Sequence, residues 1–162
     1  MPSLNQHIKA LAQATGWSGL NTPKANFWQV HLDKDLTPVF FQLGDQKIVL
    51  RGQVMPLPLD LAEKTALIKR IAALTVAMMH ECSSIIALEK AGESLVQGLD
   101  DSQDAVICLR ILPLNIDDES FLAQVQDWLD DYDWWKKTLS QAESPSTMGN
   151  LFSSVIFEGL KL

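Results

Sequence analysis

The clearest pattern in the chain is an apolar run that stops at a proline and is followed by an amphipathic segment. Residues 105–112 are almost continuously apolar, as in a strand buried on both faces, and Pro113 ends the run. Acidic residues 117–119 then stand where the start of a helix favours negative charge and a capping side chain. The apolar positions that follow recur at steps of three and four: Phe121, Leu122, Val125, Trp128, Leu129, Tyr132, Trp135 and Leu139. We therefore expect a strand and then a helix that docks one face on a core.

Similar patterns predict the other elements. The expected order is a helix between Ser3 and Gly16, strands over 27–32, 39–43 and 47–54, a helix from Asp60 to about Glu81, and strands near 85–88, 94–99 and 105–112, followed by the last helix. The short connections between the first three strands favour antiparallel pairing. The predicted fold is α+β, a twisted antiparallel sheet of five or six strands with three main helices.

The early strands predict an apolar core face and a second, more polar face. The alternating positions expected to pack on the helices are Trp28, Val30, Leu32, Val39, Phe41, Leu43, Ile48, Leu50 and Val54. The other face still carries Phe27, Phe40 and Val49 among polar residues. Two interpretations remain open for these three, ordinary surface residues or part of a binding face.

The helix expected over 60–81 is unusual because its second half is apolar on nearly every side. A helix of this kind is buried on several sides, which indicates either a subunit interface or a central core helix.

Composition and charge narrow the class of protein. The chain has 162 residues with 47% hydrophobic content, enough for one core, and a formal net charge of −7 without a basic cluster, so nucleic-acid binding is not expected. No 18-residue apolar run and no signal-peptide pattern occur, so we expect no membrane insertion and a cytoplasmic location. Cys82 and Cys108 lack C-x-x-C spacing and are expected to be reduced core thiols.

The sequence offers little support for catalysis. The three histidines are far apart, and neither a zinc motif, a phosphate loop, a dinucleotide fingerprint nor a nucleophile elbow occurs. We therefore expect no enzyme activity, cofactor or metal. The acidic residues Asp127, Asp130, Asp131 and Asp133 fit a solvated helix face or a docking site for a basic partner.

From residue 1 to about 141, the order of elements resembles the class I type III secretion chaperones, small acidic bacterial proteins that escort virulence effectors. The ending Ile111-Leu112-Pro113-Leu114, followed by Phe121 through Trp135, carries the resemblance best. The resemblance implies a homodimer, and an effector whose chaperone-binding segment is held in extended form through apolar anchors and strand pairing. It also implies the secretion-system ATPase as a further partner.

Carried over to this sequence, the resemblance places each surface on particular residues. The implied effector-binding residues are Leu4, Ile8, Leu11, Phe27, Phe40 and Val49. The implied dimer interface consists of Ile68, Ile71, Leu74, Thr75, Met78, Met79, Ile86 and Leu88.

The end of the chain departs from this family pattern. Residues 142–150 read as a linker after a domain that spans 1–141, and residues 151–157 begin an apolar segment beyond the usual last helix. The apolar positions of this extension fit a helical stripe: Leu151, Phe152, Val155, Ile156 and Leu160. Residues 155–157 also suit a strand, and the extension is a candidate cover for the effector groove.

A competing interpretation is an acidic immunity protein that neutralises a toxin through the acids of residues 117–133. Such a protein binds a folded domain, whereas a chaperone binds an unfolded segment. A plain structural interaction domain is the third interpretation.

Overall fold

The computed structural model of the chain describes residues 3–17, 20–24, 26–32, 36–93 and 102–141. Within these ranges the elements are α1 (Leu4–Thr15), β1 (Leu20–Lys24), β2 (Phe27–Val30), β3 (Val39–Leu43), β4 (Lys47–Pro56), α2 (Leu61–Met78), β5 (Ile85–Glu89), β6 (Ala105–Pro113) and α3 (Asp118–Ser140). The strands form one antiparallel sheet in the order β1-β2-β3-β4-β6-β5. The predicted α+β class is confirmed.

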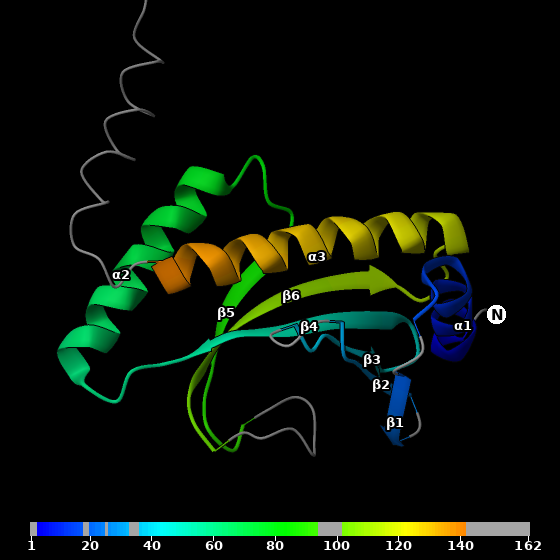
Figure 1. Cartoon of the computed structure of the whole chain (residues 1–162), viewed down its shortest axis with the longest axis horizontal. Coiled ribbons are helices and arrows are strands. Elements are labelled where there is room, and N and C mark those ends of the chain that lie inside the picture. The colour runs from blue at the N-terminus through cyan, green and yellow to red at the C-terminus, as the bar shows by residue number, and fades with distance from the viewer. Residues whose placement is uncertain (1–2, 18–19, 25, 33–35, 94–101, 142–162) are drawn as a thin grey trace, which may run out of the picture.

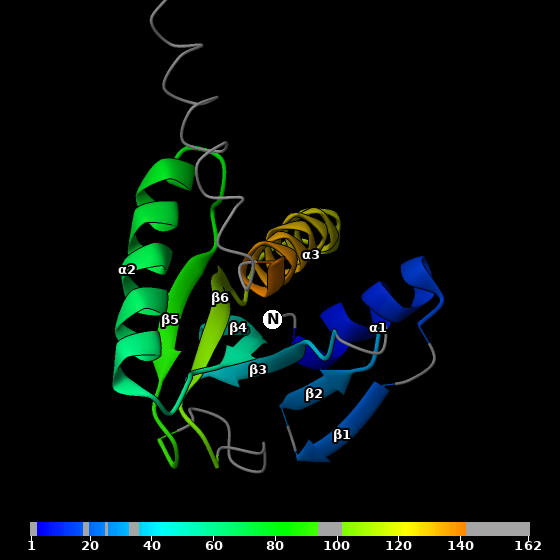
Figure 2. The same cartoon turned by 60° about the vertical axis from the view of Figure 1, so that its left-hand side comes forward.

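The three helices share one apolar core against the sheet, and α3 runs along it (Figure 1). Figure 2 shows α2 beside β5 at one end of the molecule, and α1 with β1 and β2 at the other. The predicted apolar stripe of α3 is confirmed, because its buried residues are Phe121, Val125, Trp128, Tyr132, Trp135 and Leu139. Helix α3 is therefore the main support of the sheet.

Local sequence signals explain where the helices begin and end. The Ser3 amide donates to Gln6 Oε1 at 2.9 Å, and Gly16 ends α1 in the left-handed region with φ 72°. Asp60 and Asp117 are the N-caps of α2 and α3, and each side chain accepts a hydrogen bond from a backbone amide three residues later.

Two elements differ from the sequence prediction. Strand β1 was not predicted, so four strands rather than three precede α2 in the described ranges. The predicted strand over 94–99 lies outside the described residues, as does the extension over 142–162. The division of the chain at residue 141 remains a prediction.

The prediction of the core face was wrong for part of β3. Phe40 faces the helices and packs edge-on against Trp128, with ring centroids 6.3 Å apart. Val39 and Phe41 point to the opposite face, where they form a second cluster with Phe27 and Val49. The error arises because three consecutive apolar residues in β3 give no polar position to fix the alternation.

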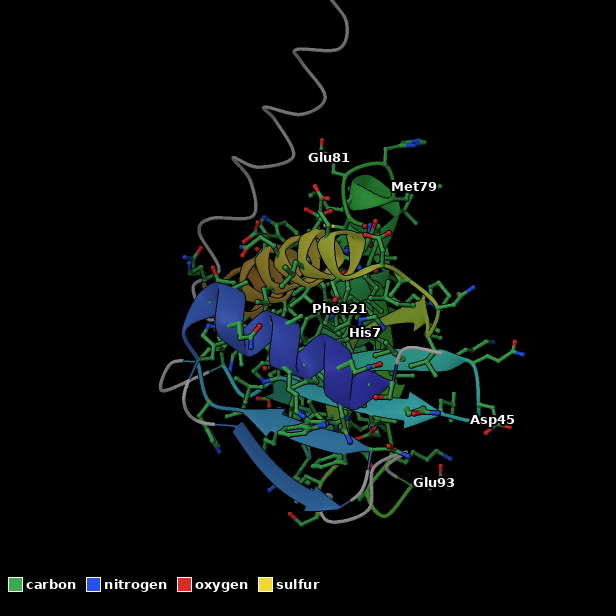
Figure 3. All side chains as sticks on the ribbon, turned by 90° about the vertical axis from the view of Figure 1, so that its right-hand side faces the viewer. His7, Asp45, Met79, Glu81, Glu93 and Phe121 are labelled. Atoms are coloured by element: carbon green, nitrogen blue, oxygen red, sulfur yellow. The ribbon has the colours of Figure 1, made fainter. Side chains whose placement is uncertain are left out.

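His7 is a buried polar link between α1 and the start of α3. Its ring is fully buried and stacks on Phe121 with centroids 4.9 Å apart. Figure 3 shows the two side chains next to each other. Nδ1 lies 2.8 Å from Asp118 Oδ1, and Nε2 lies 3.1 Å from the carbonyl oxygen of Leu114. The side chain therefore fixes α1 to the turn that precedes α3. None of the helices in the described ranges is both long and apolar enough to span a membrane.

Candidate partner-binding surfaces

The outward side of α2 is an exposed apolar surface. Three large side chains stand out, with exposed fractions of 76% for Leu61, 69% for Val76 and 63% for Met79. On a helical projection they share a face with Thr65, Ile68, Ala72 and Thr75, a set without a charged residue. We call these seven positions the α2 stripe. Figure 3 shows Met79 and Glu81 at the end of α2, projecting from the body of the molecule.

The inward side of α2 packs on the chain's own core. Ile71 is buried there, while Leu67 and Leu74 are half-buried against the same core. The helix therefore has one side attached and one side open, rather than burial all round. Arg70 also attaches it, because its Nη2 donates to the carbonyl oxygen of Thr138 in α3 at 2.7 Å.

The residues predicted for a dimer interface divide between these two sides. Thr75 and Met79 belong to the open side, as does half-buried Ile68. Ile71 and Leu74 contact the core, and so does Ile86 on β5. Two further predicted residues, half-buried Met78 and exposed Leu88, flank these groups. Dimerisation through these residues remains a prediction, with the α2 stripe as its exposed part.

The face of the sheet opposite the helices forms a second candidate surface, called here the back face. Its centre is the buried cluster of Phe27, Val39, Phe41 and Val49, with Leu109 packed against it. Strand pairing places Ile111 beside Val49, and Leu43 ends β3 on the same face. These two side chains are 47% and 45% exposed. An apolar partner would therefore meet the back face at Ile111 and Leu43.

A buried ion pair lies on the same back face. Arg51 on β4 donates from Nε to Glu89 Oε2 at 3.2 Å, and its Nη2 bonds the other carboxylate oxygen. Both side chains are almost fully buried, and Arg51 pairs in register with Val39 and Leu109. The pair joins β4 to edge strand β5 across β6, so it fixes the position of that edge.

All six predicted effector-binding residues are buried, and four of them lie in the core between the helices and the sheet. Leu4, Ile8 and Leu11 are buried on α1, and Phe40 is buried beneath Trp128. Their side chains contact the chain's own core, so a client could reach them only by displacing a helix. Phe27 and Val49 lie on the back face instead, next to the exposed side chains named above. Effector binding at the back face remains a prediction.

A polar network holds the connection between α2 and β5 against α3. Arg110 on β6 donates from Nη2 to Ser83 Oγ at 2.6 Å and to Asp131 Oδ2 at 2.9 Å. Its Nη1 donates to the carbonyl oxygen of Gln124 at 3.0 Å, and Ser84 also bonds Asp131. Asp131 therefore has a structural partner, which differs from the interpretation of its acidic group as a freely solvated face. The partners are distant in sequence. The only sequence signal for this network is the position of Arg110 in the alternation of its strand, on the face that packs against the helices.

The two thiols have environments that disfavour the reactive thiolate. Burial raises the pKa of Cys108 to about 12, and burial together with the Asp131 carboxylate raises the pKa of Cys82 to about 11. Both cysteines are free, but only Cys108 is a core thiol as predicted, because Cys82 is half-buried outside the core. Among the described residues, no group of three or more His, Cys, Asp or Glu side chains could hold a metal ion. These surfaces can offer a partner apolar contacts and backbone hydrogen bonds.

Comparisons with known proteins identify the fold. No protein-family model and no curated protein matches the sequence. YbjN, a proposed transcription regulator from E. coli, matches with TM-score 0.59 and 10% identity over 86% of this chain and 93% of its own. A chain in the structure of the HopA1-SchA chaperone-effector complex matches with TM-score 0.52 and 9% identity over 82% and 95%. An uncharacterized protein from Methanothermobacter thermautotrophicus matches with TM-score 0.55 and 10% identity over 86% and 99%.

Proposed function

We propose that the chain is a cytoplasmic chaperone that binds the N-terminal segment of a type III secretion effector in extended form. The observation that carries the proposal is the fold shared with a chain of a chaperone-effector complex, over 82% of this chain and 95% of that chain. The resemblance of the sequence to class I secretion chaperones, carried best by Ile111 to Leu114 and by Phe121 to Trp135, points the same way. The same fold occurs in YbjN, so a binding experiment has to decide the function.

The surfaces of the chain are suited to an extended client. In the described ranges, β1 and β5 are the two edges of the sheet, and an edge strand offers unpaired backbone groups to a further strand. The back face supplies apolar contacts at Ile111 and Leu43. Backbone pairing would provide affinity, and the apolar contacts would select side chains of the client. This function needs no catalytic residue, cofactor or metal.

The proposed chaperone is a homodimer joined through the α2 stripe. Large exposed apolar patches on soluble proteins usually mark interaction sites, and closed two-fold dimers are the commonest oligomers. The stripe meets the first condition because it combines Leu61, Val76 and Met79 with uncharged neighbours. The secretion-system ATPase remains a further proposed partner.

Co-purification tests the proposal directly. The full chain would be co-expressed with the N-terminal segment of each type III effector encoded in the source genome, and each effector domain without that segment would be the control. We expect one or more segments to co-purify and to give nuclear magnetic resonance spectra without the dispersion of a folded domain. Cys82→Ser should leave this binding unchanged, because the function assigns the thiol no chemistry.

Two matched variants separate client binding from assembly. Ile111→Asp places a carboxylate on the back face and should weaken the segment about 5- to 150-fold, the loss expected for a central apolar contact. Val76→Asp, on the α2 stripe, should leave the intrinsic affinity of each chain for the segment unchanged. Binding of a folded toxin domain in place of any effector segment would instead identify an acidic immunity protein, and the chaperone proposal would be wrong.

A further inference from the structure

The α2 stripe is an exposed apolar surface that no other described residues cover. Leu61, Val76 and Met79 expose most of their side chains. The charged residues of α2 lie outside the stripe, with Lys64 and Lys69 along its two margins. An uncharged helical face of this kind is suited to a second amphipathic segment packed along it.

The chain itself carries an apolar segment beyond α3 that the fold leaves unused. Leu151, Phe152, Val155, Ile156 and Leu160 fall on one stripe at helical spacing, separated from α3 by residues 142–150, whose sequence is typical of a linker. This segment lies outside the described residues.

The point where this segment leaves the folded body lies next to α2. Arg70 stands near the middle of α2, and its Nη2 donates to the carbonyl oxygen of Thr138, three residues before the α3 C-cap Gln141. Figure 1 shows that the C-terminal end of α3, in orange, points toward the end of the molecule that carries α2. The chain therefore continues from near the middle of α2, on the inward side of this helix and opposite the stripe.

The connecting residues are long enough to reach any part of the stripe. The 18 residues of α2 span about 27 Å, so either end lies about 14 Å from its middle. Residues 142–150 span about 30 Å when extended and about 17 Å as a flexible chain. The linker also has to pass round α2, which is about 10–12 Å across with its side chains, and when extended it is long enough to do so and reach the stripe.

We infer that residues 151–160 bind the α2 stripe of their own chain through their apolar positions. The segment then competes with a second copy for the same surface, so assembly becomes dependent on release of the segment. The inference concerns the stripe alone and holds whether or not the chain binds an effector. It differs from the prediction that the extension covers the effector groove, because the back face lies across the sheet from the helix-packed core.

Disulfide trapping in the full chain tests the contact. Val76→Cys, in a Cys82→Ser background, would be combined with a cysteine at position 152, 155, 156 or 160, one at a time. Leu43→Cys in place of Val76→Cys is the matched control, because Leu43 is also exposed but lies on the back face. Mixing unlabelled and ¹⁵N-labelled chains before oxidation distinguishes links within a chain from links between chains by mass spectrometry.

We expect Val76→Cys to form an intrachain disulfide with one or more of the four positions. This disulfide should form about tenfold faster than the one with Leu43→Cys, because docking raises the local concentration of the thiol. Equal rates for Val76→Cys and Leu43→Cys would overturn the inference. Links only between chains would also overturn it, and would assign the stripe to a second copy or to an exchanged segment.

A second measurement does not depend on the introduced cysteines. Phe152→Asp should remove one apolar anchor of the segment, and hydrogen exchange at residues 61–78 of the full chain should then become several-fold faster. Gln141→Asp supplies an exposed control outside the segment. The exchange would be measured at protein concentrations where the native chain and the Phe152→Asp variant are both monomeric. An unchanged exchange rate in Phe152→Asp would contradict the contact.

Discussion

At the scale of single residues, Gly52 is a position where the fold admits no side chain. A Cβ atom at this site would lie 2.5 Å from Cζ of Tyr132 and 2.6 Å from Cε1, inside van der Waals contact. The ring cannot move away freely, because its hydroxyl donates to the carbonyl oxygen of Gln53 at 2.8 Å and it stacks on Trp128. We expect Gly52→Ala to lower the free energy of unfolding by about 1–3 kcal/mol in urea titrations.

The double variant Gly52→Ala/Tyr132→Leu tests the steric cause. Leucine at 132 removes the ring that the new methyl group meets, so adding Gly52→Ala to Tyr132→Leu should cost much less than adding it to the native chain. Equal costs in the two backgrounds would show that the Tyr132 ring is not the reason for glycine at this position.

Buried polar residues are the part of the structure that the sequence could not indicate. His7, Arg51 and Arg110 are all almost fully buried. Their partners lie at least 14 residues away, so no local spacing predicts these pairs. Apolar residues with a regular period were easier, and the α1 positions Leu4, Ile8 and Leu11 were predicted on one stripe that proved to be buried. Their assignment to an open groove failed because periodicity identifies a buried face without identifying what buries it.

At the scale of elements, Arg110 joins β6, α3 and the connection after α2. Removing its guanidinium leaves the Asp131 carboxylate largely buried without its ion-pair partner. We expect Arg110→Met to lower the free energy of unfolding by about 3–5 kcal/mol, because an uncompensated buried charge is costly. Chemical denaturation followed by circular dichroism would measure the loss.

Asp131→Leu supplies the partner variant for Arg110. The double variant Arg110→Met/Asp131→Leu should be more stable than Arg110→Met alone, because no unpaired carboxylate then remains. Additive losses would mean that the two side chains do not depend on each other.

Two carboxylates at element ends make the fold sensitive to acid. The Lys64 ammonium, followed by the Ala91 amide, lowers the pKa of Asp104, while the amide and hydroxyl of Ser120 lower the pKa of the α3 cap Asp117. A carboxylate with a lowered folded pKa contributes stability above its ordinary value of about 4, and loses it as the pH falls through the folded value. We expect the free energy of unfolding to decrease from pH 7 to pH 3.

Neutral substitutions test the origin of this acid sensitivity. Asn remains a good N-cap, so Asp117→Asn should keep most of the stability of α3 and lose less of it on acidification than the native chain. Asp104→Asn should reduce the pH dependence in the same direction. The assignment would be wrong if both variants lost as much stability between pH 7 and pH 3 as the native chain does.

The element scale also shows where prediction from periodicity ends. The α3 stripe was predicted because its apolar positions alternate with acids, so one face alone suits the core. Strand β3 and helix α2 carry apolar residues on more than one side, and their patterns do not say which side the chain covers. In α2 the core takes Ile71 and Leu74 and leaves Val76 exposed, an arrangement that depends on the position of β5 and β6. The candidate interfaces lie on these same elements, β3 and α2, because the apolar side chains that the chain's own core leaves uncovered are available to a partner.

At the scale of the whole molecule, the two proposed binding surfaces lie apart. The α2 stripe is at the end of the molecule beside β5, whereas α1 and β1 form the opposite end (Figure 2). The back face is separated from the helix-packed core by the sheet itself. A second copy on the stripe therefore leaves the back face and the edge of β1 accessible, so a dimer offers each of them twice to one extended client.

Competition between residues 151–160 and a second copy predicts how the dimer depends on concentration. A flexible linker of this length gives an effective concentration of about 1 mM, so a segment with an intrinsic dissociation constant of about 100 µM would cover roughly 90% of the stripes. Both chains must be uncovered to pair, which raises the dimer dissociation constant about 100-fold. Phe152→Asp should therefore dimerise at about 100-fold lower concentration than the native chain in sedimentation velocity.

Val76→Asp should keep the protein monomeric both in the native chain and in combination with Phe152→Asp, because dimerisation would bury its unpaired carboxylate. Leu43→Asp on the back face should leave the dimer unchanged. Equal dimer dissociation constants for the native chain and Phe152→Asp would show that the segment does not affect dimerisation. A dimer that persisted in Val76→Asp would place the subunit interface on another surface. Neither result would bear on effector binding, which Ile111→Asp tests independently at the back face.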